Sequence, residues 1–114
     1  KICIFANNLP KQTTMVRHIV MLKLKSTLVL SQKQEICQQI KQTFENLHHS
    51  IKQIRQIEVG INFNDSPFAH DVIINSVFET EDDLHQYYSH PAHLKAVQFN
   101  RNYTESKAVV DYRF

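Results

Sequence analysis

Tyrosine and histidine side chains gather in one short segment of this 114-residue sequence, from Tyr87 to His93. An imidazole can remove a proton near neutral pH, and a tyrosine hydroxyl can hold a developing oxyanion. Tyr87 and His93 are six positions apart, with Pro91 between them. Because proline interrupts a helix, side chains from two different turns can converge there. His93 and Tyr87 are therefore a candidate pair for acid–base chemistry, His93 as the base and Tyr87 as the hydrogen-bond donor, and such chemistry needs no cofactor.

A purely structural interpretation of the same residues stays open. Tyr87 shares a helical stripe with Leu84 and Tyr88, so it could be a core side chain whose hydroxyl is satisfied at the edge of the core. His93 falls in the first turn after Pro91, where an imidazole can make a local hydrogen bond only.

A further histidine, His18, lies in an alternating segment, residues 15–25. Its period of two predicts a strand on which His18, Val20 and Leu22 share one face. We expect these three side chains, together with Tyr88, to line a cavity for a ligand. The alternative is that His18 is a satisfied histidine of the core or of an interface.

The seven histidines raise the question of a metal site. Zinc needs three or four converging ligands, and Pro91 is expected to turn His90 away from the helix face that carries His93. We therefore predict no metal site and no cofactor. The acidic run 81–83 is typical of a first helical turn, where carboxylates favour the positive end of the helix dipole.

Composition narrows the function classes further. With 13 basic and 11 acidic residues the net charge is +2, and neither a basic stripe for nucleic acid nor a polybasic run for a membrane is present. Cys3 and Cys37 are too few for a disulfide framework, which favours a reducing cytoplasm. No stretch approaches the ~20 apolar residues of a membrane span. Motifs for nucleotides, phosphates, serine hydrolases and zincins are missing from the sequence.

The hydrophobic pattern predicts an α+β fold with the order βαββαβ. A capping box of Ser31 and Gln34 starts the first helix, a T-x-x-D box of Thr80 and Asp83 starts the second, and Pro91 breaks the second. This order is that of a ferredoxin-like sandwich with a four-stranded antiparallel sheet. The expected strands are 15–25, 54–63, 70–79 and 107–114, and the first helix ends at 48–50.

The helices of such a sandwich cover one face of the sheet only. Ile19 and Met21, on the face of the first strand opposite His18, are apolar as well. A second copy of the sheet is the natural cover for this face, and two-fold pairs are the commonest oligomers. We therefore expect a homodimer through the helix-free face, with an enclosed space between the two sheets.

Specific motifs add a family resemblance. VRHIVMLKLK (16–25), EVGINF (58–63), FETEDDLHQYYSHPAHLKAV (78–97) and VVDY (109–112) resemble segments of the stress-responsive A/B barrel family. The resemblance spans residues 15–114 as one domain, although the Pro-Gly pair that many members carry before the second strand is missing here. Residues 1–14 are expected to be an N-terminal extension or a segment added during expression.

The resemblance implies a dimeric α/β barrel, and most members of the family have no established activity. One plant branch is similar to a polyketide cyclase that makes olivetolic acid by an aldol ring closure. Aligned through HPAH, the paired Tyr and His of that enzyme fall on Tyr87 and His93, and its cavity histidine falls on His18. We expect a stress-associated homodimer that binds a small, mostly apolar molecule. The alternatives are a cofactor-independent cyclase or isomerase, and a heme- or quinone-type monooxygenase, for which no specific residue set is seen.

Overall fold

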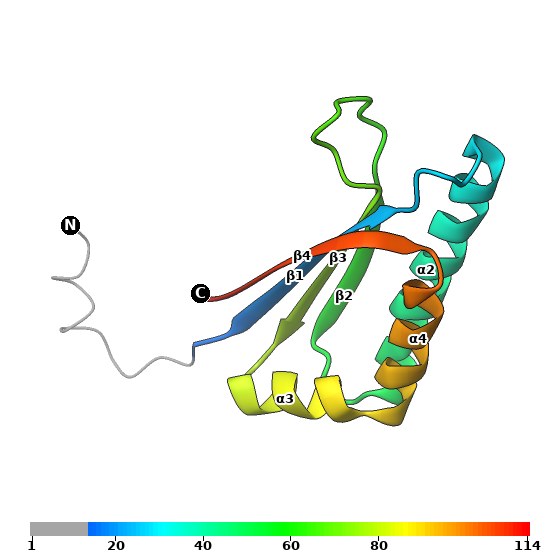
Figure 1. Ribbon diagram of the computed structural model, residues 1–114. Helices are drawn as coiled ribbons and strands as arrows, with labels where there is room; N and C mark the ends of the chain where they lie inside the picture. The colour runs from blue at the N-terminus through cyan, green and yellow to red at the C-terminus, as the bar shows by residue number, and fades with distance from the viewer. Residues whose placement is uncertain (1–13) are drawn as a thin grey trace, which may run out of the picture.

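The computed structural model describes residues 14–114 (Figure 1). It contains a four-stranded antiparallel sheet with helices along one face, as the alternating and helical patterns of apolar residues predict. The predicted order is confirmed, and so is the break of the second helix at Pro91. Apart from residue 14, the expected N-terminal segment 1–14 lies outside the described residues. The elements are β1 (Val16–Leu24), α2 (Leu30–Ser50), β2 (Gln56–Ile61), β3 (Val72–Phe78), α3 (Glu81–Ser89), α4 (Pro91–Arg101) and β4 (Thr104–Arg113).

The register of the sheet determines which side chains share a face. The strands lie in the order β2-β3-β1-β4, and β1 pairs antiparallel with both β3 and β4. His18 lies opposite Ser76 on one side and Asp111 on the other. Because directly opposed residues of an antiparallel pair point to the same face, all three lie on the helix-covered face.

Helix α2 begins two residues earlier than predicted. The expected capping box of Ser31 and Gln34 is wrong, because the backbone is already helical at Leu30 and the last extended residue is Val29. Gln32 instead reaches back, and its Oε1 accepts a hydrogen bond from the Val29 N–H at 3.1 Å. A glutamine three residues after the last non-helical residue is well placed for this contact, whichever residue precedes the helix.

The second helical segment follows the predicted signals. Thr80 Oγ1 accepts a hydrogen bond from the Asp83 N–H at 3.0 Å and so caps α3. Pro91 opens α4 at a position where its missing N–H has no cost. His90 caps this helix, because its Nδ1 accepts a hydrogen bond from the Ala92 N–H at 3.0 Å. The change of direction at this point lets α4 run beside α2 above the sheet (Figure 1).

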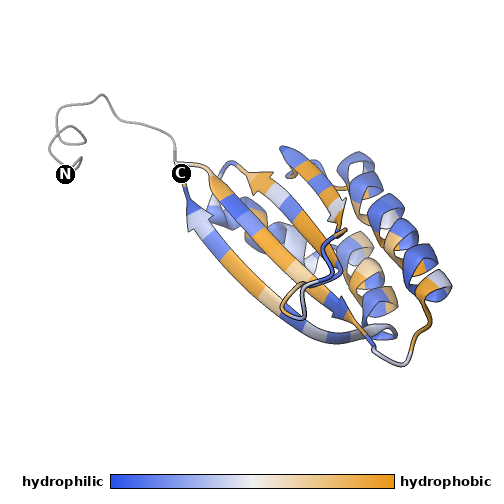
Figure 2. Cartoon of the chain, turned by 90° about the horizontal axis from the view of Figure 1, so that it is seen from above, coloured by the Kyte–Doolittle hydropathy of each residue, from blue (hydrophilic) through white to orange (hydrophobic). Residues whose placement is uncertain are grey.

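The two faces of the sheet are covered differently. Residues such as Phe44 of α2, Leu24 of β1 and Phe78 of β3 are buried between the helices and the sheet. On the helix-free face, Val110 and Tyr112 of β4 are 56% and 45% exposed. Figure 2 shows apolar and polar residues alternating along the strands, and the helices gathered on one side. Within residues 14–114, no helix combines the length and the apolar character needed to cross a membrane.

Candidate functional site

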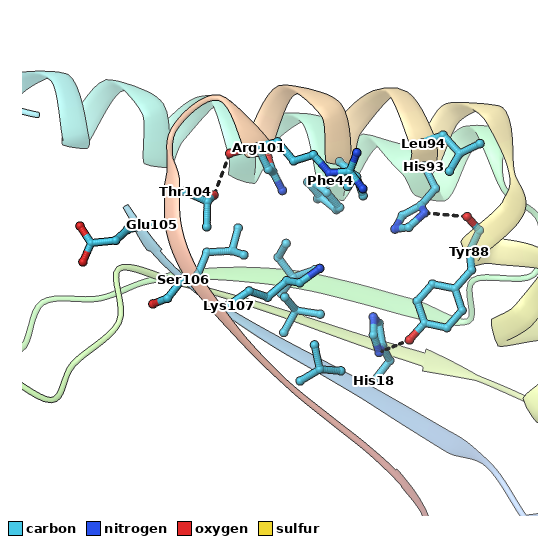
Figure 3. A pocket seen from close by; sticks show the side chains of 16 residues that line it. His18, Phe44, Tyr88, His93, Leu94, Arg101, Thr104, Glu105, Ser106 and Lys107 are labelled. Carbon is cyan, nitrogen blue, oxygen red and sulfur yellow. Dashed lines mark hydrogen bonds between the residues drawn. The ribbon is translucent and has the colours of Figure 1, made fainter. Parts of the chain in front are cut away.

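A pocket of about 560 Å³ lies between the helix-covered face of the sheet and the helices α2 and α4. Its volume falls within the ~300–1,000 Å³ of small-molecule sites. The middle of the pocket is apolar, and polar side chains stand at both of its ends (Figure 3). The apolar wall comes from every strand but β2 and from both helices, through Val20, Leu22, Phe44, Ile74, Val97 and Val109.

The pocket lies inside one chain, between its sheet and its own helices. The sequence predicted a space between two sheets, but His18, Val20 and Leu22 point toward the chain's own helices and line the pocket there. Tyr88 and His93 line the same pocket from α3 and α4. The period of two correctly placed the three strand residues on one face. It carries no information about which face the helices cover.

One end of the pocket holds a buried histidine that is oriented by two neighbours. His18 is 3% exposed, and its Nδ1 contacts Oδ1 of Asp111 on the neighbouring strand. The Tyr88 hydroxyl lies 3.3 Å from His18 Nδ1 and 3.3 Å from Asp111 Oδ2. A carboxylate only accepts hydrogen bonds, so both the His18 Nδ1–H and the Tyr88 O–H donate to it. The other ring nitrogen of His18, Nε2, points into the pocket (Figure 3).

His93 stands across the pocket from His18. Its Nδ1 lies 3.1 Å from the backbone carbonyl oxygen of Tyr88, to which it donates, and its Nε2 faces the cavity (Figure 3). Burial lowers the pKa of His93 below 6.5, and the nearby His18 and Lys107 lower this pKa as well. The hydrogen bond to Tyr88 raises the pKa, but its effect is outweighed. A neutral His93 with a free Nε2 is therefore the dominant form near pH 7, which suits a proton acceptor.

The two tyrosines occupy different environments. Burial raises the pKa of the Tyr88 hydroxyl to about 12, and the charge of Asp111 adds to this effect. Tyr87 is only 1% exposed and packs its ring 4.2 Å from that of His93 and 5.0 Å from that of Phe78. Burial raises the pKa of Tyr87 as well. Because neighbouring residues of a helix point about 100° apart, Tyr87 enters the aromatic core while Tyr88 reaches the pocket wall.

The sequence analysis missed Asp111 and the polar residues at the other end of the pocket. Asn100 and Arg101 at the end of α4, with Lys107 of β4, line the other end of the pocket. Asn100 is 7% exposed, and its Oδ1 has no hydrogen-bond partner within the described residues. Asp111 could have been suspected from the VVDY motif, but only the register of β1 and β4 brings it to His18.

The structure brings no metal-ligand cluster together. Within residues 14–114, no group of three or more His, Cys, Asp or Glu side chains is placed to hold a metal ion. The ring nitrogen Nδ1 of His90 is already engaged in capping α4.

Comparison with known proteins gives a family match and several similar structures. The family model described as Stress responsive A/B Barrel Domain matches residues 16–114. A dimeric protein of unknown function with a ferredoxin-like fold, from Bacteroides fragilis, is 37% identical; the match covers 88% of this chain and 96% of that chain, with a TM-score of 0.81.

Two further solved structures are more distant in sequence. A dimeric ferredoxin-like protein of unknown function from Thermobifida fusca is 20% identical over 94% of this chain and 97% of its own, with a TM-score of 0.76. The hydroxynitrile lyase from Passiflora edulis is 21% identical over 90% of this chain and 95% of its own, with a TM-score of 0.75. At these identities the likeness is one of fold. No match is found among proteins of curated function.

Proposed function

Because the chain belongs to the stress responsive A/B barrel domain family, we propose that it is a homodimer in which each subunit binds one small, mostly apolar molecule. This proposal rests on the pocket of about 560 Å³ inside one chain. The middle of the pocket is apolar, and His18 and His93 face each other at one of its ends. Concave, mostly apolar sites with a few convergent polar groups are typical of ligand binding. The presence of only two cysteines favours a reducing, cytoplasmic location as part of the same proposal.

The helix-free face supports the dimer. The register places Ile19 and Met21 of β1 beside Ile73 of β3 and Val110 of β4 on this face. Polar residues such as Glu58 lie toward its rim. An apolar centre with a polar rim is the usual anatomy of a protein interface. The solved structures from Bacteroides fragilis and Thermobifida fusca are themselves described as dimeric.

Binding can be tested with a neutral apolar probe, 4-phenylbutan-1-ol, in a titration followed by amide chemical shifts in NMR spectra. We expect the largest shifts at pocket residues such as Leu22, Val97 and Val109, with little change at Ile73 and Gly60 on the helix-free side of the sheet. Shifts confined to the helix-free side would move the ligand site to the interface. A spectrum that does not change up to the solubility limit of the probe would refute apolar binding.

A second candidate function, cofactor-independent acid–base catalysis, is favoured by the two histidines that face one space. His93 Nε2 would remove a proton from a carbon next to a carbonyl group, and the resulting enolate would take a proton back from solvent. His18, held by Asp111, stands across the same space as a hydrogen-bonding partner for the substrate. Tyr87 would support His93 through their ring contact, since its hydroxyl is not part of the pocket wall.

This catalysis predicts hydrogen–deuterium exchange at the carbons beside the carbonyl of 4-phenylbutan-2-one in D₂O, followed by NMR. General base catalysis commonly contributes about 10²- to 10⁴-fold, so we expect His93→Gln to lower the protein-dependent exchange rate by about a hundredfold. Because the pKa of His93 lies below 6.5, the rate should hold at pH 7 and fall only as the pH drops through that lowered pKa. An exchange rate in His93→Gln equal to that of the wild type would exclude His93 as the base.

A further inference from the structure

The charges around the pocket are distributed unevenly. Arg101 and Lys107 line the end formed by the last turn of α4 and the start of β4, and neither forms an ion pair within the described residues. The acidic residue at this end, Glu105, points away from the cavity in Figure 3, and its Oε1 accepts a hydrogen bond from the Ser26 N–H at 3.1 Å. This end of the pocket therefore carries unpaired positive charge.

The side chain of Lys107 is directed inward. It lies on the helix-covered face, directly opposite Leu22 of β1. Figure 3 shows its ammonium group extending into the cavity, and its charge is one of the causes that lower the pKa of His93. Lys107 is exposed overall, so its ammonium group is free to bind an anionic group of a molecule in the pocket.

A second, independent feature points to a polar ligand group at the same end. Asn100 is more than nine-tenths buried, lines the pocket, and has an amide oxygen without a partner within the described residues. Its backbone oxygen is satisfied by the Thr104 hydroxyl at 2.7 Å, so the unmet requirement belongs to the side chain alone. Buried side-chain amides that lack a partner are rare and costly, and the NH₂ group of the Asn100 amide can donate a hydrogen bond to a ligand oxygen at this end of the pocket.

We propose that the ligand is an amphipathic carboxylate, a molecule with an apolar body and one negatively charged end. The charged end binds Lys107 and Arg101, the body covers Val20, Leu22 and Val109, and the far end of the molecule lies between His18 and His93. This inference rests on the proposed ligand-binding function and adds the chemical class and the orientation of the ligand. It also separates the anchoring end of the pocket from the end where acid–base chemistry would occur.

The test compares three probes with the same apolar body: 4-phenylbutyrate, 4-phenylbutan-1-ol and 4-phenylbutylamine. A charge-assisted contact adds about 1.5 kcal/mol or more, so we expect the carboxylate to bind about tenfold tighter than the alcohol, and the amine to bind most weakly. Lys107→Gln should remove most of this advantage, and it should lower the affinity for the alcohol much less than the affinity for the carboxylate. Lys95→Gln makes the same change of charge on an exposed lysine of α4 outside the pocket lining, and it should leave the tenfold ratio intact.

The outcomes separate the two proposals. If the alcohol binds as tightly as the carboxylate, or if the amine does, ligand binding stands and the carboxylate class is wrong. If none of the three probes binds, the ligand-binding function itself is wrong. If Lys107→Gln does not fold, Arg101→Gln is the second variant. If Arg101→Gln binds the carboxylate and the alcohol with the same ratio of affinities as the wild type, the carboxylate does not bind at this end of the pocket.

Discussion

Replacing Ile19 with aspartate should separate the dimer into monomers. Ile19 lies on the helix-free face of β1, directly opposite Val110 of β4. In the proposed dimer the new carboxylate would be buried between two apolar sheets. An uncompensated charge in such a place costs about 3–5 kcal/mol, which corresponds to a dissociation constant raised at least a hundredfold. Sedimentation velocity at several protein concentrations measures this change, and circular dichroism reports whether the variant folds.

Two variants complete this experiment. Val29→Asp makes the same kind of substitution at a residue that is 60% exposed beside α2, and it should leave the dimer unaffected. Val110→Asp places the charge at a second position on the helix-free face and should act like Ile19→Asp. Dimers of unchanged stability in both Ile19→Asp and Val110→Asp would show that subunits meet through another surface.

Replacing Val109 with tryptophan should abolish ligand binding without dissolving the fold. Val109 lies opposite Val20 on the helix-covered face, lines the pocket, and is 46% exposed, so an indole has room to enter from the open side. The larger side chain occupies the space that the phenylbutyl body needs. We expect the affinity for 4-phenylbutan-1-ol to fall by about a hundredfold, a change of about 2.7 kcal/mol.

The conservative change at the same position provides the control. Val109→Ile adds one methylene group and should reduce the affinity for the alcohol only slightly, because aliphatic swaps of similar volume are tolerated. Both variants should keep the melting temperature of the wild type to within a few degrees. Wild-type affinity in Val109→Trp would place the ligand elsewhere on the molecule.

The order of the elements could be predicted from the sequence because each one carries a local signal. Alternation in residues 15–25 indicated a strand, and the Thr80 box and Pro91 marked the two helices α3 and α4. The start of α2 was missed because a serine followed by a glutamine resembles a capping box wherever the chain turns, and here the turn occurs at Val29.

The assembly of the site depends on contacts that no local pattern contains. His18 and Asp111 are 93 positions apart and meet only through the register of β1 and β4. Pairing Tyr87 with His93 followed the spacing across Pro91, and their rings do meet, but the helical rotation brings Tyr88 to the cavity. The face of the sheet that holds the cavity was likewise not given by alternation, since both faces of β1 contain apolar residues.

The central claim is that the cavity belongs to each subunit and that the helix-free face joins two subunits. Native mass spectrometry of the protein mixed with the tightest-binding phenylbutyl probe tests both parts at once. We expect a species of twice the 13.4 kDa chain mass that takes up two probe molecules, one for each pocket. A dimer that saturates with a single probe molecule would place the cavity between the two sheets. A protein that is monomeric at micromolar concentration would contradict the claim that a second copy covers the helix-free face.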